Sequence, residues 1–205
     1  MLRPPHLPED LVVFDEFCQL VADGQKADLL DGVIYMASPD SLRSDGITNL
    51  VHFLIEGFVG ARGIAGRVLG SRFAFRLSET RAPEPDVAYV VPERIHLLEE
   101  RGMLGGPDIA VEIVARESRS RDYVEKRRIY EEAGVREYWI IDPLQARAEF
   151  LRLGPGGYGL VPLQRNRIFV SDVIPGFWID TDWLLAQPIP AAHDCLRQIL
   201  SGEPK

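Results

Sequence analysis

The sequence predicts a mixed α/β (α+β) domain in which helices flank a central β-sheet. Three observations predict this class: an apolar strand over 109–115, a second apolar strand over 137–142, and an amphipathic helix over about 121–133 between them. An unbroken apolar run of strand length is typical of a central strand that is covered on both faces. Helices interleaved with such strands produce layered sheets. The 205 residues fit a single domain, 1–205.

The N-terminal part predicts a short helix, a hairpin and a long helix. Residues 15–22 favour the short helix, and 26–37 favour a hairpin that turns at Asp31-Gly32. Residues 38–41 then supply helix-start signals. An apolar face recurs behind them at helical spacing, which predicts a long helix packed on the sheet. That face consists of Ile47, Leu50, Val51, Leu54, Ile55 and Phe58.

Short strands are predicted in the middle of the chain and in the C-terminal tail. Gly134 and Pro143 mark the ends of the second helix and the second apolar strand. From 147 to about 185, short strands alternate with turns. Aromatic residues of this tail either close the core, which we favour, or form a partner surface: Phe177, Trp178 and Trp183. Further short strands are predicted at 67–69, 72–77 and 86–91.

Charge and composition limit the classes of function. The net charge of −8 argues against a protein that coats nucleic acid by bulk electrostatics, but residues 116–128 carry a local excess of +3. No apolar run approaches the ~20 residues of a membrane helix, so we expect no membrane partner. Residues 1–10 lack the apolar core of a signal peptide. Cys18 and Cys195 form no disulfide or metal motif. We therefore expect a cytoplasmic protein with reduced thiols.

One charged residue interrupts the strand over 109–115. Glu112 stands in the middle of six apolar residues. An ionised carboxylate taken out of water costs several kcal/mol unless a partner pairs with it or a metal coordinates it. A lone acid in a strand is also compatible with a position at the rim or in a buried ion pair. Glu112 is therefore a candidate site residue that needs a partner.

Three other residues are candidates for the same site, each with a simpler alternative. Asp86 opens an apolar strand after two prolines, where an acid often serves only a turn. Lys126 lies on the inward, aromatic side of its helix. Its alternative role, an i, i+4 bridge to Asp122, is worth only about 0.3–0.5 kcal/mol and does not explain that placement. Asp28 lies in the first hairpin strand, where a solvent-facing role is the alternative.

Together these residues supply what phosphodiester cleavage needs. Carboxylate oxygens bind hard cations such as Mg²⁺. The metal polarises the phosphate and lowers the pKa of a bound water. A nearby lysine orients that water and offsets the negative charge that develops on the phosphate. The four histidines, His6, His52, His96 and His193, have no metal-ligand spacing and are expected at the surface or in ordinary packing.

Two segments, PEPDVAYV (83–90) and DIAVEIVARESRSRDYVEKRRIYEEAGVREYWIIDP (108–143), resemble the Uma-two family of restriction-endonuclease-like proteins in the PD-(D/E)XK nuclease superfamily. The resemblance implies a restriction-endonuclease-like core, a Mg²⁺ or Mn²⁺ cofactor, a DNA substrate and, by analogy, a homodimer. It implies that Asp86 and Glu112 bind the metal, with the Ile113 carbonyl as a further ligand. Lys126 takes the lysine role, moved from the strand to the next helix.

The sequence also departs from the family pattern. Asp28 stands where the family usually has glutamate, and Ser44 where many relatives carry histidine. Ala115-Arg116 replace a common Ser-Pro. Val114 stands where the superfamily usually has lysine, a change that the family shares. Two main hypotheses follow: a metal-dependent DNA endonuclease, and a catalytically inactive relative that acts as a DNA-binding or protein-interaction module. A glycosidase with paired carboxylates is a weaker third hypothesis.

Overall fold

A mixed six-stranded sheet forms the centre of the computed structural model, which describes residues 10–22 and 24–202. The strand order is β11-β10-β9-β8-β5-β3. Strand β8 is central, parallel to β9 and antiparallel to β5. This confirms the predicted fold class and the central position of the strand that carries Glu112. The strands are β3 (Arg67–Gly70), β5 (Val87–Val90), β8 (Ile109–Ile113), β9 (Glu137–Asp142), β10 (Arg147–Gly154) and β11 (Gly157–Leu160).

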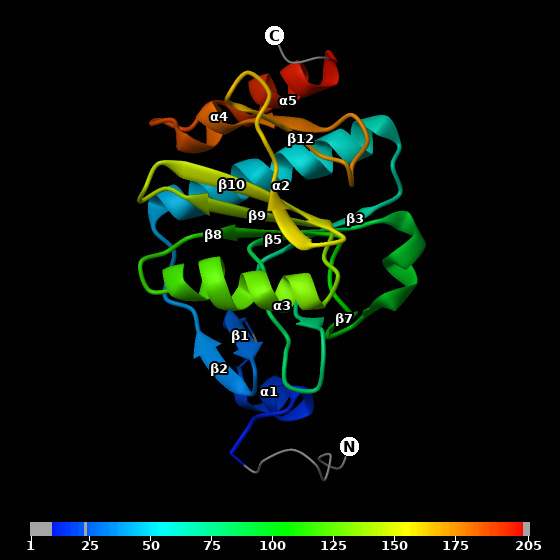
Figure 1. Ribbon diagram of the computed structural model, residues 1–205, viewed down its shortest axis with the longest axis vertical. Coiled ribbons are helices and arrows are strands. Elements are labelled where there is room, and N and C mark those ends of the chain that lie inside the picture. Colours follow the sequence, from blue (N-terminus) through cyan, green and yellow to red (C-terminus); the bar gives the residue numbers. More distant parts are fainter. Residues whose placement is uncertain (1–9, 23, 203–205) are drawn as a thin grey trace.

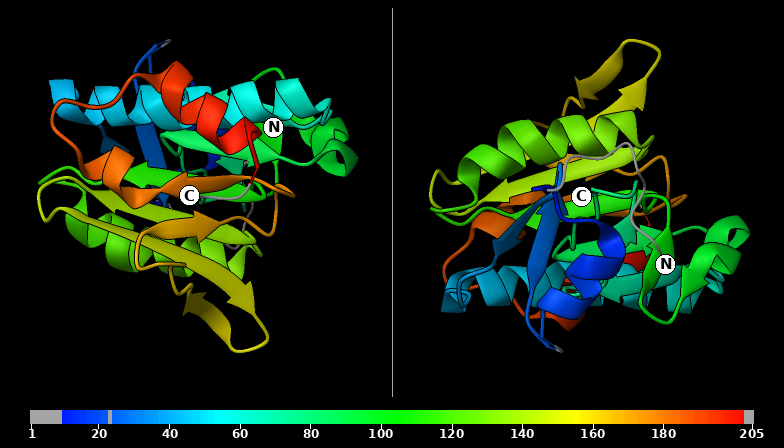
Figure 2. Two further views of the ribbon diagram at one scale, coloured as in Figure 1. Left: turned by 90° about the horizontal axis from the view of Figure 1, so that it is seen from above. Right: turned by 90° about the horizontal axis from the view of Figure 1, so that it is seen from below.

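Two helices cover opposite faces of this sheet (Figures 1 and 2). Helix α2 (Leu42–Arg62) begins where the Ser41 side chain accepts a hydrogen bond from the Ser44 N–H. It ends at Gly63, whose left-handed φ of 65° suits glycine. On the other face, α3 (Arg127–Glu132) continues directly from a π-helical segment, Arg121–Lys126. The sequence predicted a plain α-helix over this range.

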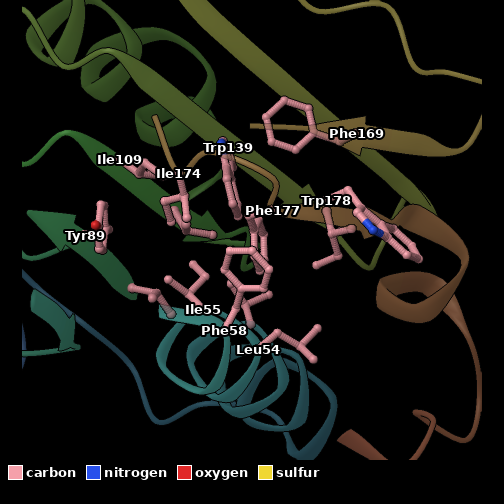
Figure 3. Close-up of a cluster of buried hydrophobic side chains, with 14 of the residues drawn as sticks. Leu54, Ile55, Phe58, Tyr89, Ile109, Trp139, Phe169, Ile174, Phe177 and Trp178 are labelled. Atoms are coloured by element: carbon pink, nitrogen blue, oxygen red, sulfur yellow. The ribbon is translucent and has the colours of Figure 1, made fainter. Parts of the chain in front are cut away.

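Alternation along β8 explains why its two faces differ. Ile109, Val111 and Ile113 pack in the large core cluster with α2, whereas Ala110 and Val114 pack with Tyr130 of α3. Glu112 shares the face of Ala110 and Val114, so its carboxylate points toward the helix that carries Lys126. Figure 3 shows the large cluster, in which residues of α2 meet aromatic side chains of the C-terminal part.

The predicted hairpin is confirmed as β1 (Ala27–Leu30) and β2 (Val33–Met36), and the short helix as α1 (Phe14–Leu20). Asp31 and Gly32 both have positive φ at the turn, which two-residue hairpins favour. Strand β1 is fully buried, and an isolated bridge joins Leu29 to Ala82. The hairpin projects from the end of the sheet beside α3 (Figure 1).

The prediction of a strand over 72–77 is wrong in length, and the strand that does form belongs to a different sheet from β3 and β5. Only Phe75–Arg76 (β4) is extended, because the chain turns at Arg72, which has a φ of 74°. The strand β4 pairs with β7 (Gly102–Leu104) in a small separate sheet that also holds β6 (Leu98–Glu99). A 3₁₀ helix, Pro92–Leu97, precedes β6. No residue pattern over 72–77 predicts this departure of the chain from the main sheet.

The C-terminal tail closes the core, as we favoured. Strands β12 (Ile168–Val170) and β13 (Trp178–Asp180) pair with each other, and Phe177 and Trp178 are buried. Two helices that the sequence did not predict follow: α4 (Thr181–Leu185) and α5 (Ala192–Leu200), the second packed on α2.

Residues 1–9 lie outside the described residues. They include His6 and nine of the ten residues that lack the features of a signal peptide. No helix in the described ranges is long and apolar enough to span a membrane.

Candidate active site

A cleft of about 680 Å³ lies where the hairpin, α2, the sheet and the π-helical segment meet. All five residues that the sequence singled out line this cleft. The structure therefore brings together residues that lie up to 98 positions apart in the chain. They are Asp28, Asp86, Glu112, Ile113 and Lys126.

The pairing of β5 with β8 places the first two carboxylates side by side. Strand β5 pairs with β8 from Val87, opposite Val111, and Asp86, just before this pair, donates its backbone N–H to the Val111 carbonyl at 3.0 Å. Asp86 and Glu112 therefore come from neighbouring chain segments and line the same cleft. Asp86 is further fixed because its Oδ2 accepts the backbone N–H of Ile113 at 2.7 Å. Asp86 is thus a buried carboxylate bonded to β8, the strand that carries Glu112, and not a residue that only serves a turn.

Lys126 reaches the same point from the other side. Its Nζ lies 2.9 Å from Glu112 Oε1 and 2.8 Å from Asp28 Oδ2, and only 2% of the residue is exposed. The predicted bridge to Asp122 is also present, but it is the longest of the three at 3.8 Å. The inward placement that the helical pattern predicts is therefore confirmed, and the i, i+4 bridge alone does not account for it.

The π-helical segment has an identifiable local cause. The hydroxyl of Tyr138, on β9, donates to the backbone carbonyl of Asp122 at 2.8 Å. In an α-helix that carbonyl would accept the N–H of Lys126. A side chain that inserts into the helical ladder widens the turn. Asp122 and Lys126, at the two ends of the widened turn, are both buried.

Asp28 is held inside the cleft by two bonds. Its Oδ1 accepts the backbone N–H of Glu84 at 2.8 Å, and its Oδ2 pairs with Lys126. Alternation on β1 therefore turns Asp28 inward, and the alternative of a solvent-facing residue is wrong. The shorter side chain, where relatives carry glutamate, still reaches the lysine.

Three residues of the site were missed from the sequence. Lys26 forms an ion pair with Asp86 Oδ1. Asp122 accepts a hydrogen bond from Ser118 Oγ at 2.5 Å, and Tyr130 donates its hydroxyl to Glu112 Oε1 at 2.9 Å. Spacing could have found them. Lys26 is two residues from Asp28 on an extended strand, and Asp122 and Tyr130 flank Lys126 at i−4 and i+4.

Burial perturbs the ionisation of this cluster. Burial raises the pKa of Glu112 to about 8, against the attraction of Lys126. Burial likewise raises the pKa of Asp122 to about 6. Burial opposes the charge of Lys126, but Asp28, Glu112 and Asp122 outweigh it and raise its pKa well above the usual range. Lys126 is therefore a stable cation, and the carboxylates share an excess of negative charge.

The donor set fits a hard divalent cation. With Glu112 deprotonated, as a metal ligand must be, four carboxylates (Asp28, Asp86, Glu112, Asp122) face two lysines, which leaves an excess of two negative charges. Asp122 Oδ1 is buried and accepts no hydrogen bond within the described part of the chain. No group of three or more histidine, cysteine, aspartate or glutamate side chains among the described residues has metal-binding geometry. Two carboxylates in an open cleft match Mg²⁺, which usually binds one or two carboxylates and keeps several waters.

The departures from the family pattern have local explanations. Ser44 is buried, and its hydroxyl lies 2.8 Å from that of Ser41 at the start of α2, so the position serves the cap. The Ala115 N–H donates to Ser118 Oγ at 3.1 Å, which fixes the chain as it leaves β8. About two turns further along α2, His52 lines the cleft, although the sequence predicted only an ordinary surface or packing role.

Comparisons with known proteins identify a family and a similar fold. A family model described as "Putative restriction endonuclease" (Uma2) matches residues 14–182. The fold is similar to a crystal structure described as that of "a putative nuclease belonging to DUF820" from Anabaena variabilis ATCC 29413. The TM-score is 0.68 and the sequence identity 16%, over 85% of this chain and 97% of that chain. At this identity the likeness shows the fold. No curated protein matches the chain.

Proposed function

The chain belongs to the Uma2 family, and from this premise we propose that it is a divalent-metal-dependent DNA endonuclease that hydrolyses phosphodiester bonds. The observation that carries the proposal is the position of Lys126. A buried ammonium lies 2.9 Å from Glu112, in a cleft that Asp86 also lines and that has an excess of negative charge. Lysine beside paired carboxylates is the set that metal-assisted phosphodiester hydrolysis uses.

Asp86 and Glu112 are the residues that would hold the metal, and the Ile113 carbonyl is a proposed third ligand. When bound, Mg²⁺ or Mn²⁺ supplies Lewis-acid polarisation of the phosphate and lowers the pKa of water. The Ile113 N–H fixes the orientation of Asp86 before any ligand arrives. Tyr130 does the same for Glu112. Such preorganised carboxylates need no rearrangement at the moment of reaction.

Lys126 orients the attacking water and offsets the charge on the phosphate. Asp28 and Glu112 direct two of its three donors and so fix the ammonium, and the third donor, whose nearest carboxylate is Asp122 at 3.8 Å, is the one for the water. Asp28 acts through Lys126: it holds the lysine and is itself tied to the Glu84 backbone. A homodimer, proposed by family analogy for cutting both strands, is tested by sedimentation of the purified protein. The cytoplasmic location stays a prediction.

Plasmid cleavage tests the enzyme. Purified protein should nick or linearise supercoiled plasmid with Mg²⁺ or Mn²⁺ and leave it intact with EDTA, and Asp86→Ala should abolish the activity. Linear duplex, single-stranded DNA and RNA belong in the same assay, because the residues do not specify the form of the substrate. If no form is cut in a metal-dependent way that Asp86→Ala removes, the endonuclease proposal is wrong.

The second candidate is an inactive relative that binds DNA or a protein. One observation favours it: each of the two proposed metal-binding carboxylates already forms an ion pair with a lysine, Asp86 with Lys26 and Glu112 with Lys126. A site neutralised in this way has no need of a metal. Calorimetry separates the candidates, since an inactive module should show no Mn²⁺ binding that Glu112→Gln removes.

A further inference from the structure

Lys26 is a second cleft lysine with a role still to be explained. It directly precedes β1, two residues before Asp28, so both side chains lie on one face of the extended chain. Its ammonium pairs with Asp86 Oδ1. The side chain is 20% exposed, whereas that of Lys126 is 3% exposed. Lys126 is enclosed by protein, but Lys26 borders the open cleft.

The pairing places Lys26 where a metal ligand would be needed. Asp86 Oδ2 already accepts the Ile113 N–H, so Oδ1 is the oxygen that faces a cation in the cleft without that bond. Lys26 occupies that oxygen. A divalent cation that binds Asp86 must therefore share or take the position of a lysine ammonium. The compact, flexible lysine head group is suited to such an exchange, more than a planar guanidinium would be.

Lysine is rare in this chain, and its two lysines in the cleft, Lys26 and Lys126, stand out for that reason. Lys26, Lys126 and Lys205 are the only lysines among 23 lysine and arginine residues. Two of the three line one cleft, and Lys205 lies outside the described residues. Elsewhere the chain uses arginine for positive charge, so lysine is concentrated where a small mobile ammonium is useful.

We propose that Lys26 stands in for the metal in the metal-free protein and, when a divalent cation binds Asp86, is released to contact the phosphate of the nucleic-acid substrate. This inference rests on the proposed endonuclease function. Release costs little, because the cation that displaces Lys26 takes over the charge of Asp86. The freed ammonium stays in the cleft on a four-carbon stem whose backbone is fixed, since the Lys26 carbonyl accepts the Ala37 N–H at 3.0 Å.

A purely structural role for Lys26 gives different expectations. If the ion pair only clamps the hairpin to the sheet, loss of the lysine should loosen Asp86. Metal affinity and cleavage would then fall together. If Lys26 competes with the metal and later binds phosphate, loss of the lysine should strengthen metal binding while it weakens cleavage. The two readouts move in opposite directions only under the proposal.

The experiment compares wild type with Lys26→Met, and uses Arg67→Met as a control that removes one exposed cation from β3, outside the cleft. Mn²⁺ affinity is measured by calorimetry without DNA, and cleavage by the initial rate of plasmid nicking. Lys26→Met should bind Mn²⁺ about 3- to 10-fold more tightly and cleave at least about 10-fold more slowly, the scale of one electrostatic contact. Arg67→Met should match wild type in both.

Parallel losses of affinity and rate, or no change in either, would overturn the inference. A wild-type protein that neither binds Mn²⁺ nor cleaves would instead overturn the proposed function itself. A second measurement covers a variant that does not fold. In wild-type protein labelled with ¹³C-lysine, the Lys26 ε-methylene signal, assigned with Lys26→Arg, should shift on saturation with Mg²⁺. A Lys26 signal that stays in place under saturating Mg²⁺ contradicts the release.

Discussion

Lys126 is the residue on which the charge balance of the cleft depends. Its ammonium lies among Asp28, Glu112 and Asp122, and all four residues are buried. Loss of the cation from such a buried group is costly, because it leaves three buried carboxylates without a compensating charge. The same ammonium is the group that we assign to the attacking water, so structure and activity are coupled at this residue.

Replacement of Lys126 by methionine should therefore lower the plasmid-nicking rate by about 100-fold or more, the usual cost of an electrostatic catalytic group. The control is Arg128→Met, two residues away on the same helix. Arg128 is exposed and pairs with Asp31 and Glu132 at the surface. Surface pairs contribute at most about 1 kcal/mol, so the control should keep the wild-type rate within about twofold. Equal losses of nicking rate in both variants would show that Lys126 has no specific role in cleavage.

Asp122 gives a prediction for stability against pH. Its pKa is raised from 3.8 to about 6, mainly by burial. The folded state thus holds the proton more tightly than the unfolded state, so this contribution to stability is present at low pH and is lost as pH rises from about 4 to 6.

Asp122→Asn imitates the protonated form at every pH. In EDTA, urea unfolding should show the variant about 1–3 kcal/mol more stable than wild type at pH 7.5, and nearly equal to it at pH 4. The asparagine oxygen can still accept a hydrogen bond from the Ser118 hydroxyl, so wild type and variant both keep that bond. A stability difference that is the same at both pH values would contradict the burial account.

The site also shows which residues a sequence can reveal. Glu112 stood out because a carboxylate breaks an apolar strand, and Lys126 because helical periodicity turns it inward. Lys26 and Asp122 did not stand out. Each lies next to polar neighbours in the sequence, and only the pairing of strands and the π-helical turn brings them to the carboxylates. Their spacing from Asp28 and Lys126 makes them neighbours of the candidates, but the carboxylate or lysine that each one meets depends on long-range pairing, which has no local signal.

At the scale of the element, the π-helical segment positions the lysine. Tyr138→Phe removes the hydroxyl that donates to the Asp122 carbonyl, and the lost buried bond should cost about 1–2 kcal/mol of unfolding free energy. Since the widened turn carries Lys126, the nicking rate should also fall, by about 5- to 10-fold, a cost of about 1–1.4 kcal/mol in the barrier.

Tyr158→Phe is the matched control. The Tyr158 hydroxyl donates to the Val135 carbonyl at 2.7 Å, in the same buried cluster and beyond the end of α3. It should lose similar stability in chemical denaturation and keep its nicking rate. If both variants lose activity equally, the effect is one of general stability, and the π-helical turn has no separate function.

Elements were predictable to different degrees for physical reasons. The hairpin, α2 and the paired apolar strands carry strong periodicity and turn residues, and all of them form where expected. The excursion at β4 was missed because Arg72 adopts a positive φ that its residue type does not announce. Helix α5 lies beyond the predicted strands and turns, which end at about 185, and the sequence analysis assigns no element there, although its inward residues, Cys195 and Ile199, have helical spacing.

At the scale of the whole molecule, the prediction of a single domain can be tested by cooperativity. The large core joins α2 to the tail, and the three tryptophans, Trp139, Trp178 and Trp183, all lie in or against it. Urea unfolding followed by tryptophan fluorescence should therefore coincide with unfolding followed by circular dichroism, which reports every helix and strand. Two separated transitions would show that the hairpin region unfolds as an independent unit.

The central claim is that Asp86 and Glu112 form a divalent-metal site beside Lys126. Anomalous diffraction from a crystal soaked in Mn²⁺ tests it most directly, because the signal locates the ion without any assumption about activity. We expect a peak between the Asp86 and Glu112 carboxylates, with the Lys126 ammonium still paired to Glu112 and Asp28. Saturating Mn²⁺ with no peak at these carboxylates, or with a peak only elsewhere on the molecule, would contradict it.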